Sequence, residues 1–178
     1  MSETATRLMD LAETHIRESG YGGFSFRELA AQIGIKSASV HHHFPTKAVM
    51  VAAVARRYGE RFFEKVAPKP DETPADAIDS YKAAFRDGFV EDGLMCLYGV
   101  LGTETGALTP EVSEEIVAFF RHSIDDLSRR IGGAESRERA FNVMATLEGG
   151  LMLARAYGDV TAFDHAVASL AQASGERS

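Results

Sequence analysis

Residues 25–47 read SFRELAAQIGIKSASVHHHFPTK, and this stretch begins with a clear signal for a short helix. Ser25 is followed three residues later by Glu28, the spacing of a capping box. In a capping box each side chain binds the other residue's backbone N–H at the start of a helix. The apolar residues that follow predict a short helix over 26–33, which ends at Gly34.

A second short helix follows after a turn of three residues, and the pair predicts a helix-turn-helix. The second helix should run from Ser37 to about His43, because Pro45 cannot continue it. Two short helices joined by a Gly-containing turn are typical of this motif. Its second helix lies in the major groove of DNA, and its first helix crosses the backbone. The small side chains of residues 37–40 would let the helix approach base edges.

The charge distribution also favours contact with phosphate in this region. The net charge of the chain is −7, but residues 20–61 hold six basic and only two acidic side chains. Local charge steers phosphate contact more than the total does. Ser25, Lys36 and Lys47 stand at predicted helix starts, where N–H donors and the helix dipole favour anions.

Composition predicts a globular chain in the cytoplasm. The 178 residues are 45% hydrophobic and 25% charged, without an apolar run long enough to cross a membrane. The N-terminus lacks the apolar segment of a signal peptide. The single cysteine, Cys96, excludes an intrachain disulfide and a structural zinc cluster of thiolates.

The rest of the chain has helical periodicity, so we expect an all-α fold of about nine helices. The proline-rich segment 68–74 is the best boundary candidate, and Thr73 with Pro74 should start the helix after it. Thr161 and Asp164 predict a capping box for the last helix. The expected helices cover residues 4–19, 26–33, 37–43, 47–66, 75–90, a shorter stretch within 93–106, 110–131, 136–157 and 161–173.

Residues 20–50, GYGGFSFRELAAQIGIKSASVHHHFPTKAVM, resemble the DNA-binding signature of the tetracycline-repressor (TetR) family of bacterial regulators. The shared features are the Gly-Tyr turn, the Ser before the second helix, the Leu-Ala and Ile-Gly-Ile steps and the His-Phe-Pro-x-Lys ending. The resemblance covers about residues 5–60. It implies a three-helix DNA-binding domain over 1–46 and a helical ligand-binding and dimerisation domain over 47–178.

The resemblance also implies a function and a set of contact residues. We expect a homodimeric transcriptional regulator, more often a repressor than an activator, that binds a double-stranded DNA operator and responds to a small-molecule effector without a cofactor. His41 stands where the family usually has Tyr, and its imidazole can still donate a hydrogen bond. The residues expected to contact DNA are Ser25, Arg27, Lys36, Ser37, Ala38, Ser39, His41, His42, Thr46 and Lys47.

The three consecutive histidines allow a metal site, a DNA contact or a solvated polar face. Successive residues on a helix diverge by about 100°, so adjacent histidines cannot converge on one metal ion. We therefore expect no metal site. His41 and His42 should face DNA, and His43 should pack beneath the domain.

Cys96, in the stretch GLMCLYGVLGTE, has two interpretations. A free cysteine is often a small buried hydrophobic residue. The stretch is also similar to the Gly-Cys-Leu segment of family members that respond to electrophiles or oxidants. A reactive thiol needs nearby cations or a helix N-terminus, whereas the nearest charges in sequence are Asp87, Glu91 and Asp92. A repressor that senses electrophiles through Cys96 is thus the alternative function.

An effector site is expected in the second domain, with plain core packing as the alternative for its aromatic residues, and a dimer interface is expected there as well. Phe119 and Glu104 are further effector candidates, and a close helix approach would explain the Gly149–Gly150 pair. The expected effector-binding residues are Tyr81, Phe85, Phe89, Cys96, Tyr98, Phe120 and His122. The expected dimer contacts, on the two last helices, are Leu147, Leu151, Phe163, Val167 and Leu170.

Two other classes of protein remain as rivals. An all-helical enzyme is disfavoured because the sequence contains no Gly-rich phosphate loop, no HExxH and no GxSxG. A helical interaction protein that does not bind DNA is disfavoured by the basic segment 20–61 and its helix-turn-helix pattern.

Overall fold

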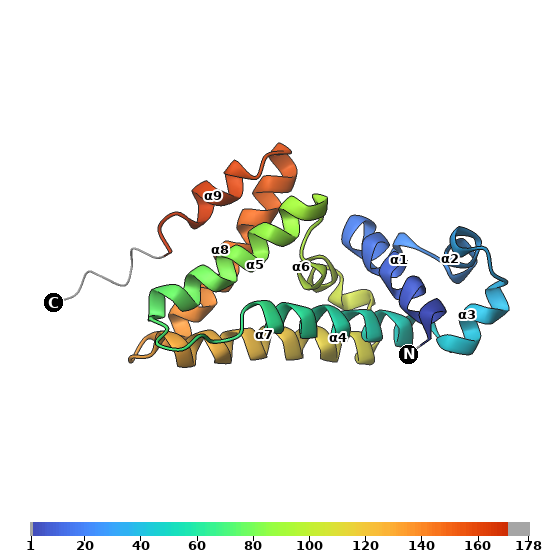
Figure 1. Cartoon of the computed structure of the whole chain (residues 1–178), viewed down its shortest axis with the longest axis horizontal. Coiled ribbons are helices and arrows are strands. Elements are labelled where there is room, and N and C mark those ends of the chain that lie inside the picture. The colour runs from blue at the N-terminus through green and yellow to red at the C-terminus, as the bar shows by residue number, and fades with distance from the viewer. Residues whose placement is uncertain (1, 171–178) are drawn as a thin grey trace. The chain divides into compact units, whose positions relative to one another are not determined.

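The computed structural model of the chain describes residues 2–170, and the regular secondary structure of this range is entirely helical (Figure 1). The predicted all-α fold is therefore confirmed. No helix in the described range is both long and apolar enough to span a membrane. The α-helices are α1 (Glu3–Ser19), α2 (Phe26–Ile33), α3 (Ser37–His43), α4 (Lys47–Lys65), α5 (Pro74–Asp92), α6 (Leu97–Gly102), α7 (Pro110–Ile131), α8 (Ser136–Tyr157) and α9 (Thr161–Val167). Two short 3₁₀ helices are η1 (Tyr21–Gly23) and η2 (Thr105–Ala107).

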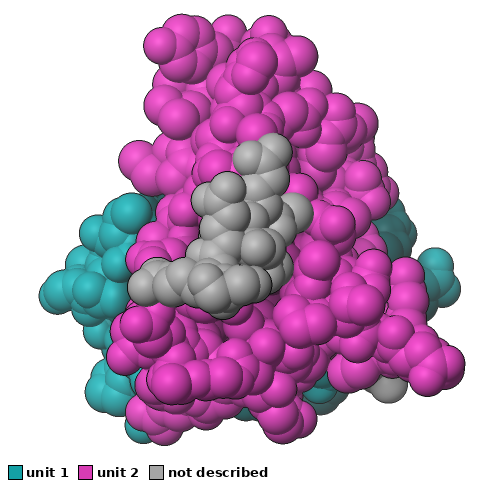
Figure 2. Space-filling view, turned by 90° about the vertical axis from the view of Figure 1, so that its left-hand side faces the viewer, with its two compact units in different colours: residues 1–60, 97–118 teal, residues 61–96, 119–178 magenta. Residues whose placement is uncertain are grey.

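The chain folds into two compact units, which Figure 2 shows in different colours. Unit 1 comprises residues 1–60 and 97–118, and unit 2 comprises residues 61–96 and 119–178. Unit 1 thus contains α1, α2, α3, α6 and the first parts of α4 and α7, and unit 2 contains the other helices. These units do not begin or end at residue 46. The division into a DNA-binding domain over 1–46 and a ligand-binding domain over 47–178 therefore stays a prediction.

The N-terminal helices of unit 1 bury one apolar face each. Leu8, Ala12 and Ile16 lie on one face of α1 and are fully buried, as their helical spacing predicts. Leu29 of α2 and Val40 of α3 are also fully buried. Since α3 has only seven residues, its stability depends on this packing rather than on the helix itself.

Tyr98 of α6 fixes another part of unit 1. Its buried hydroxyl donates a hydrogen bond to the carbonyl oxygen of Ala55 in α4, at 2.6 Å. Gly59 leaves room for the phenol, because a Cβ there would lie 2.6 Å from the Tyr98 oxygen. A side chain at position 59 would therefore push α6 away from α4.

Two predicted helix starts are confirmed. Ser25 and Glu28 form the capping box of α2, with both reciprocal hydrogen bonds present. Thr73 caps α5 and Pro74 occupies its first turn. The Thr73 hydroxyl accepts the N–H of Asp76, whose carboxylate accepts the N–H of Thr73. These local signals can be read from sequence because the partners lie three residues apart.

The helix α9 begins at Thr161 as predicted, but the predicted capping box of Thr161 and Asp164 is wrong. Thr161 is the first residue of the helix rather than its cap, and its N–H and hydroxyl donate to the carboxylate of Asp159 at 2.9 and 2.6 Å. Asp164 instead accepts two hydrogen bonds from the guanidinium of Arg86 on α5, at 2.7 and 3.0 Å. α9 ends at Val167, and the predicted end near residue 173 lies outside the described residues.

Within unit 2, α8 and α9 approach each other closely. A Cβ at Gly150 would lie 2.9 Å from the Phe163 ring and 3.4 Å from the Cβ of Ala166. The close approach expected for the glycine pair is therefore found at Gly150. Gly149 differs, because a Cβ there would meet no atom within 4 Å.

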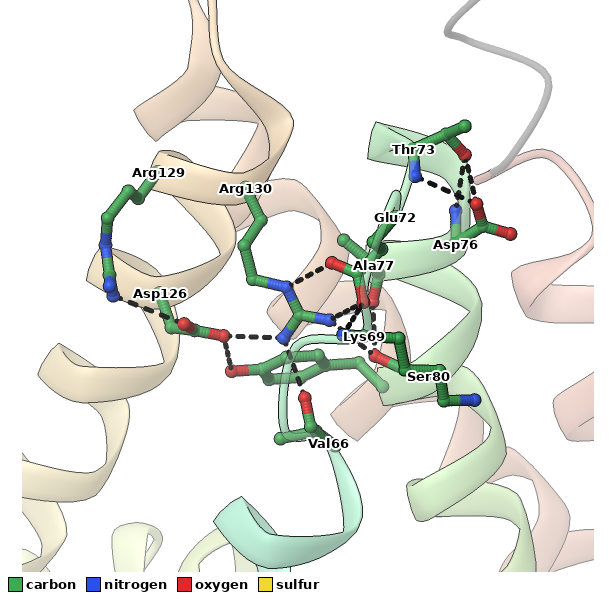
Figure 3. A network of polar contacts seen from close by, with 11 residues as sticks. Val66, Lys69, Glu72, Thr73, Asp76, Ala77, Ser80, Asp126, Arg129 and Arg130 are labelled. Carbon is green, nitrogen blue, oxygen red and sulfur yellow. Dashed lines mark hydrogen bonds and ion pairs between the residues drawn. The ribbon is translucent and has the colours of Figure 1, made fainter.

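A buried guanidinium connects three segments of unit 2 (Figure 3). Arg130 of α7 donates from Nε and Nη2 to the two carboxylate oxygens of Glu72, each at 2.8 Å. Its Nη1 donates to Asp126 and to the carbonyl oxygen of Val66, both at 2.8 Å. Its Nη2 also donates to the Ser80 hydroxyl at 3.1 Å.

The network contains three buried charges that satisfy one another. The side chains of Arg130, Glu72 and Asp126 are 7%, 8% and 10% exposed. Tyr81 adds a donor, since its hydroxyl lies 3.0 Å from the Asp126 carboxylate. Removing one member of such a group costs far more than its net contribution, because the remaining charges stay buried without a partner.

We predict that Arg130→Ala lowers the free energy of unfolding by about 3–5 kcal/mol, because Glu72 and Asp126 lose their buried cation. Arg129→Ala is the matched control: its guanidinium contacts the same Asp126 at 3.2 Å, but its side chain is 71% exposed. The control should cost less than about 1 kcal/mol. Urea unfolding at pH 7 measures both, and equal losses would contradict the prediction.

Candidate functional site

The turn between α2 and α3 is closed by backbone hydrogen bonds around Gly34. Gly34 has φ 76° and ψ 32°, a left-handed conformation that favours glycine. The N–H of Ile35 donates to the carbonyl oxygen of Ala30 at 2.9 Å, which satisfies one of the last carbonyls of α2. Lys36 is then the N-cap residue of α3. The two short helices and their turn have the arrangement of a helix-turn-helix.

Most residues expected to contact DNA are exposed on unit 1. Ser37 and Lys47 are half-buried. The other eight are exposed: Ser25, Arg27, Lys36, Ala38, Ser39, His41, His42 and Thr46. Thr46 also caps α4, because its hydroxyl accepts the N–H of Val49 at 3.2 Å. The exposed set is accessible to an external partner, and its contact with DNA stays a prediction.

The three histidines have different surroundings. The ring of His41 packs edge-on against Phe26 at 4.9 Å, and its Nδ1 lies 3.4 Å from the carbonyl oxygen of Pro45. The rings of His42 and His43 are 5.5 Å apart, with His42 exposed and His43 half-buried. Among residues 2–170, no three or more metal-ligating side chains form a group that could hold a metal ion.

Lys47 is engaged inside unit 1 in a way that sequence reasoning missed. Its ammonium donates to the carbonyl oxygen of Phe24 at 2.5 Å and lies 4.3 Å from the centre of the Phe24 ring. The ring of Tyr21 is 5.0 Å away. Burial lowers the pKa of Lys47. The side chain thus holds the turn before α2 against the start of α4, in addition to any contact with phosphate.

The same turn is held by Glu104, which the sequence suggested as an effector anchor. The backbone N–H of Tyr21 donates to Glu104 Oε2 at 3.0 Å. Gly20 has φ 77°, and a Cβ there would lie 1.8 Å from Glu104 Oε1. Glu104 therefore serves the packing of unit 1 in this structure.

The seven residues expected to bind an effector are divided between the two units. Tyr98 belongs to unit 1, where its hydroxyl is bonded to Ala55, and the other six belong to unit 2. Tyr81 and Phe85 each pack on Phe62, with ring centres 5.5 Å apart in both pairs. Phe89 and Cys96 are buried, Phe120 is half-buried and His122 is exposed.

Tyr81 takes part in the network around Arg130. It is fully buried, and its hydroxyl donates to Asp126. Burial, with the neighbouring Asp126 carboxylate, raises the pKa of Tyr81. The phenol is thus a neutral donor that the fold already uses, and core packing accounts for this residue without an effector.

The predicted dimer contacts lie mostly inside the protomer. Leu147, Leu151, Phe163 and Val167 are at most 4% exposed, so they pack within unit 2, and Leu170 is half-buried. Their role in a dimer stays a prediction. Large apolar side chains that are exposed on α8 are Phe141, Met152, Leu153 and Tyr157.

Comparison with known proteins identifies the family. The model of "bacterial regulatory proteins, tetR family" matches residues 8–54, which include α2, α3 and the turn between them. A TetR transcriptional regulator from Legionella pneumophila has the same fold, with a TM-score of 0.89, 27% sequence identity, and coverage of 97% of this chain and 98% of that one. Residues 8–54 are a TetR-family DNA-binding domain.

Two further relatives agree with this family. A transcriptional regulator of the TetR family from Agrobacterium tumefaciens matches with a TM-score of 0.89 and 26% identity, over 96% of each chain. The HTH-type transcriptional repressor KstR2 from Rhodococcus jostii (strain RHA1) is 35% identical over 75 residues. That alignment covers 42% of this chain and 35% of the relative.

A residue that sequence reasoning missed is Glu148 of α8. Both carboxyl oxygens are buried and lack a hydrogen-bond partner. Burial raises the pKa of Glu148 to about 7, and a weak interaction with the Cys96 thiol opposes this shift. A signal was present in the sequence, because Glu148 is the only charged residue between Arg139 and Arg155.

The contact with Glu148 bears on the proposed thiol sensor. Cys96 is buried, at 5% exposure. A sensor thiol is usually accessible and stabilised as thiolate by cations. A buried thiol beside a carboxyl has the opposite environment, so the structure favours the packing interpretation of Cys96.

We predict that the raised pKa makes stability fall with pH. In the folded state the pKa of Glu148 is about 7, against an ordinary value of 4.5. Between these values the folded state binds more protons than the unfolded state, so the free energy of unfolding decreases as pH rises. Glu148→Gln should remove this loss. Its gain in free energy of unfolding over the wild type should therefore be larger at pH 8.5 than at pH 5, by on the order of 2 kcal/mol.

Urea unfolding of the wild type and of Glu148→Gln at both pH values measures this difference. Glu138→Gln is the matched control, since Glu138 is an exposed residue of the same helix. A gain from Glu148→Gln that is equal at the two pH values would contradict the assignment.

Proposed function

We propose that the chain is a homodimeric transcriptional regulator that binds operator DNA through α2 and α3, and that it acts as a repressor released by a small molecule. The observation that carries this proposal is the surface of unit 1. There the helix-turn-helix presents small, polar and basic side chains to solvent, in a chain whose net charge is −7. A positive segment on an acidic protein is the electrostatic footprint of nucleic-acid binding.

The side chains of this surface suit two different tasks. Ala38, Ser39 and His42 of α3 are exposed and can meet base edges if the helix enters the major groove. Lys36 and Arg27 are exposed at or near helix starts, where they can meet phosphates. The first set would supply sequence preference, and the second would supply affinity that depends on salt.

Helix α4 is the proposed route from effector to DNA. It contributes Lys47–Glu60 to unit 1 and residues 61–65 to unit 2. In unit 1, Lys47 holds the turn before α2. In unit 2, the buried ring of Phe62 packs on Tyr81. An effector that prefers one position of α4 would change the spacing between the α3 helices of the two chains in the dimer. By linkage, the change in DNA affinity cannot exceed the difference in the effector's affinity for the two positions of α4, typically about 5- to 150-fold.

We predict that Lys36→Ala weakens binding to all duplexes alike and reduces the slope of log affinity against log salt by about one, because one phosphate contact is lost. Fluorescence anisotropy with duplexes from the DNA flanking its own gene, at several salt concentrations, measures this slope. Lys69→Ala is a control, because Lys69 is an exposed lysine of unit 2. An unchanged slope for Lys36→Ala would remove that residue from the interface.

Lys47→Ala separates two roles in the same assay. If the ammonium contacts phosphate, the slope falls by about one, as for Lys36. If it serves only the turn at Phe24, the unfolding midpoint falls while the slope is unchanged. Absence of salt-dependent binding to every duplex tested, in the folded wild type, would overturn the proposed function.

We predict that the exposed apolar side chains of α8 hold the dimer together. Met152→Glu and Tyr157→Glu should yield monomers in sedimentation at micromolar concentration, because a charge would be buried without a partner. These positions are 60% and 75% exposed in the protomer, so the variants can fold. Val90→Glu, at a 55% exposed position of α5, is the control and should stay dimeric. A wild type that sediments as a monomer would overturn the assignment.

A further inference from the structure

The carboxyl of Glu148 is the ionisable group in the described part of unit 2 that is buried without a hydrogen-bond partner, and the neutral Ser123 hydroxyl is the other buried polar group there without one. Both oxygens are shielded from solvent and neither accepts a hydrogen bond. The side chain as a whole is only half-buried, so its aliphatic part reaches toward the surface while the carboxyl points inward. The buried polar groups of the Arg130 network differ, because each of them is bonded.

The structure supplies no cation to compensate this carboxyl. Neither carboxyl oxygen is bonded to a lysine or arginine of residues 2–170, and the interaction that acts on its ionisation besides burial is that with the Cys96 thiol. A thiol is only a weak hydrogen-bond donor. An unsatisfied buried carboxyl destabilises a folded protein, so this position is suited to a partner that arrives from outside the chain.

The chemistry of that partner follows from the carboxyl. Two acceptor oxygens in an environment shielded from water bind N–H donors of a cation most strongly. An anionic ligand would add a like charge, and a neutral alcohol can donate only one hydrogen bond. We propose that Glu148 is the polar anchor of the effector site, and that the effector is an apolar molecule carrying a basic nitrogen whose N–H groups bind this carboxylate.

The role of the ligand as an effector rests on the proposed function, but binding of an amine can be measured without DNA. The probes are phenylalkyl amines with short, medium and long alkyl chains, each compared with the alcohol and the carboxylic acid that have the same apolar body. Isothermal titration calorimetry and thermal shifts at pH 8 follow their binding to the full chain. Glu148→Gln keeps the shape and removes the charge, and Glu138→Gln repeats the substitution at an exposed position of α8.

The wild type and Glu138→Gln should bind at least one amine roughly ten- to a hundredfold more tightly than its alcohol, since hydrogen bonds to charged groups exceed neutral ones by this factor. The acid should bind least. In Glu148→Gln the preference for the amine should disappear, while the alcohol binds as before.

Three results would overturn the proposal. They are an amine that binds Glu148→Gln as tightly as the wild type, an alcohol or acid that binds the wild type as well as the amine does, and a series in which no amine is preferred. If the wild type shows no preference for an amine but still binds DNA, only the inferred ligand class is wrong. If the preference is present and DNA binding is absent, Glu148 remains a ligand site and the proposed function is wrong.

Discussion

The buried guanidinium of Arg130 is the constraint on which unit 2 depends. A buried charge must be paired, and Arg130 is paired with Glu72, Asp126 and the carbonyl oxygen of Val66. These partners come from the end of α4, the segment before α5 and α7 itself. The end of α4 is therefore held by directional bonds rather than by apolar contacts alone. Directional bonds allow a small number of positions, and the proposed transmission through α4 requires distinct positions of this kind.

The helix-turn-helix could be predicted from sequence because its signals are local. The capping box of Ser25 and Glu28 has its partners three residues apart. Gly34 permits the left-handed turn, and Pro45 prevents α3 from continuing. The same local rule failed at Thr161, where the nearby carboxylate of Asp159 bound the helix start and the distant Arg86 bound Asp164. A capping prediction from sequence holds only where no other partner competes.

Contacts between distant segments could not be predicted, since no periodicity encodes them. The bond from Lys47 to Phe24 spans 23 residues, and that from Tyr98 to Ala55 spans 43. Both assign a structural role to a side chain for which the sequence suggested a binding role. The apolar residues of α8 suggested a dimer contact, because the sequence could not distinguish packing against α9 from packing against a second chain. The division into units likewise follows from pairings that only the fold reveals.

Cys96 shows how a neighbour from far along the chain changes an interpretation. In sequence its nearest charges are Asp87, Glu91 and Asp92, whereas the carboxyl that acts on it in the structure is that of Glu148. Burial of that carboxyl opposes its charge and so destabilises the folded chain. A cationic ligand would offset this destabilisation only in conformations in which the carboxyl is buried next to the ligand. Such a ligand binds some conformations of the chain more tightly than others. By linkage, only a ligand with such a difference in affinity can change the affinity of the chain for DNA.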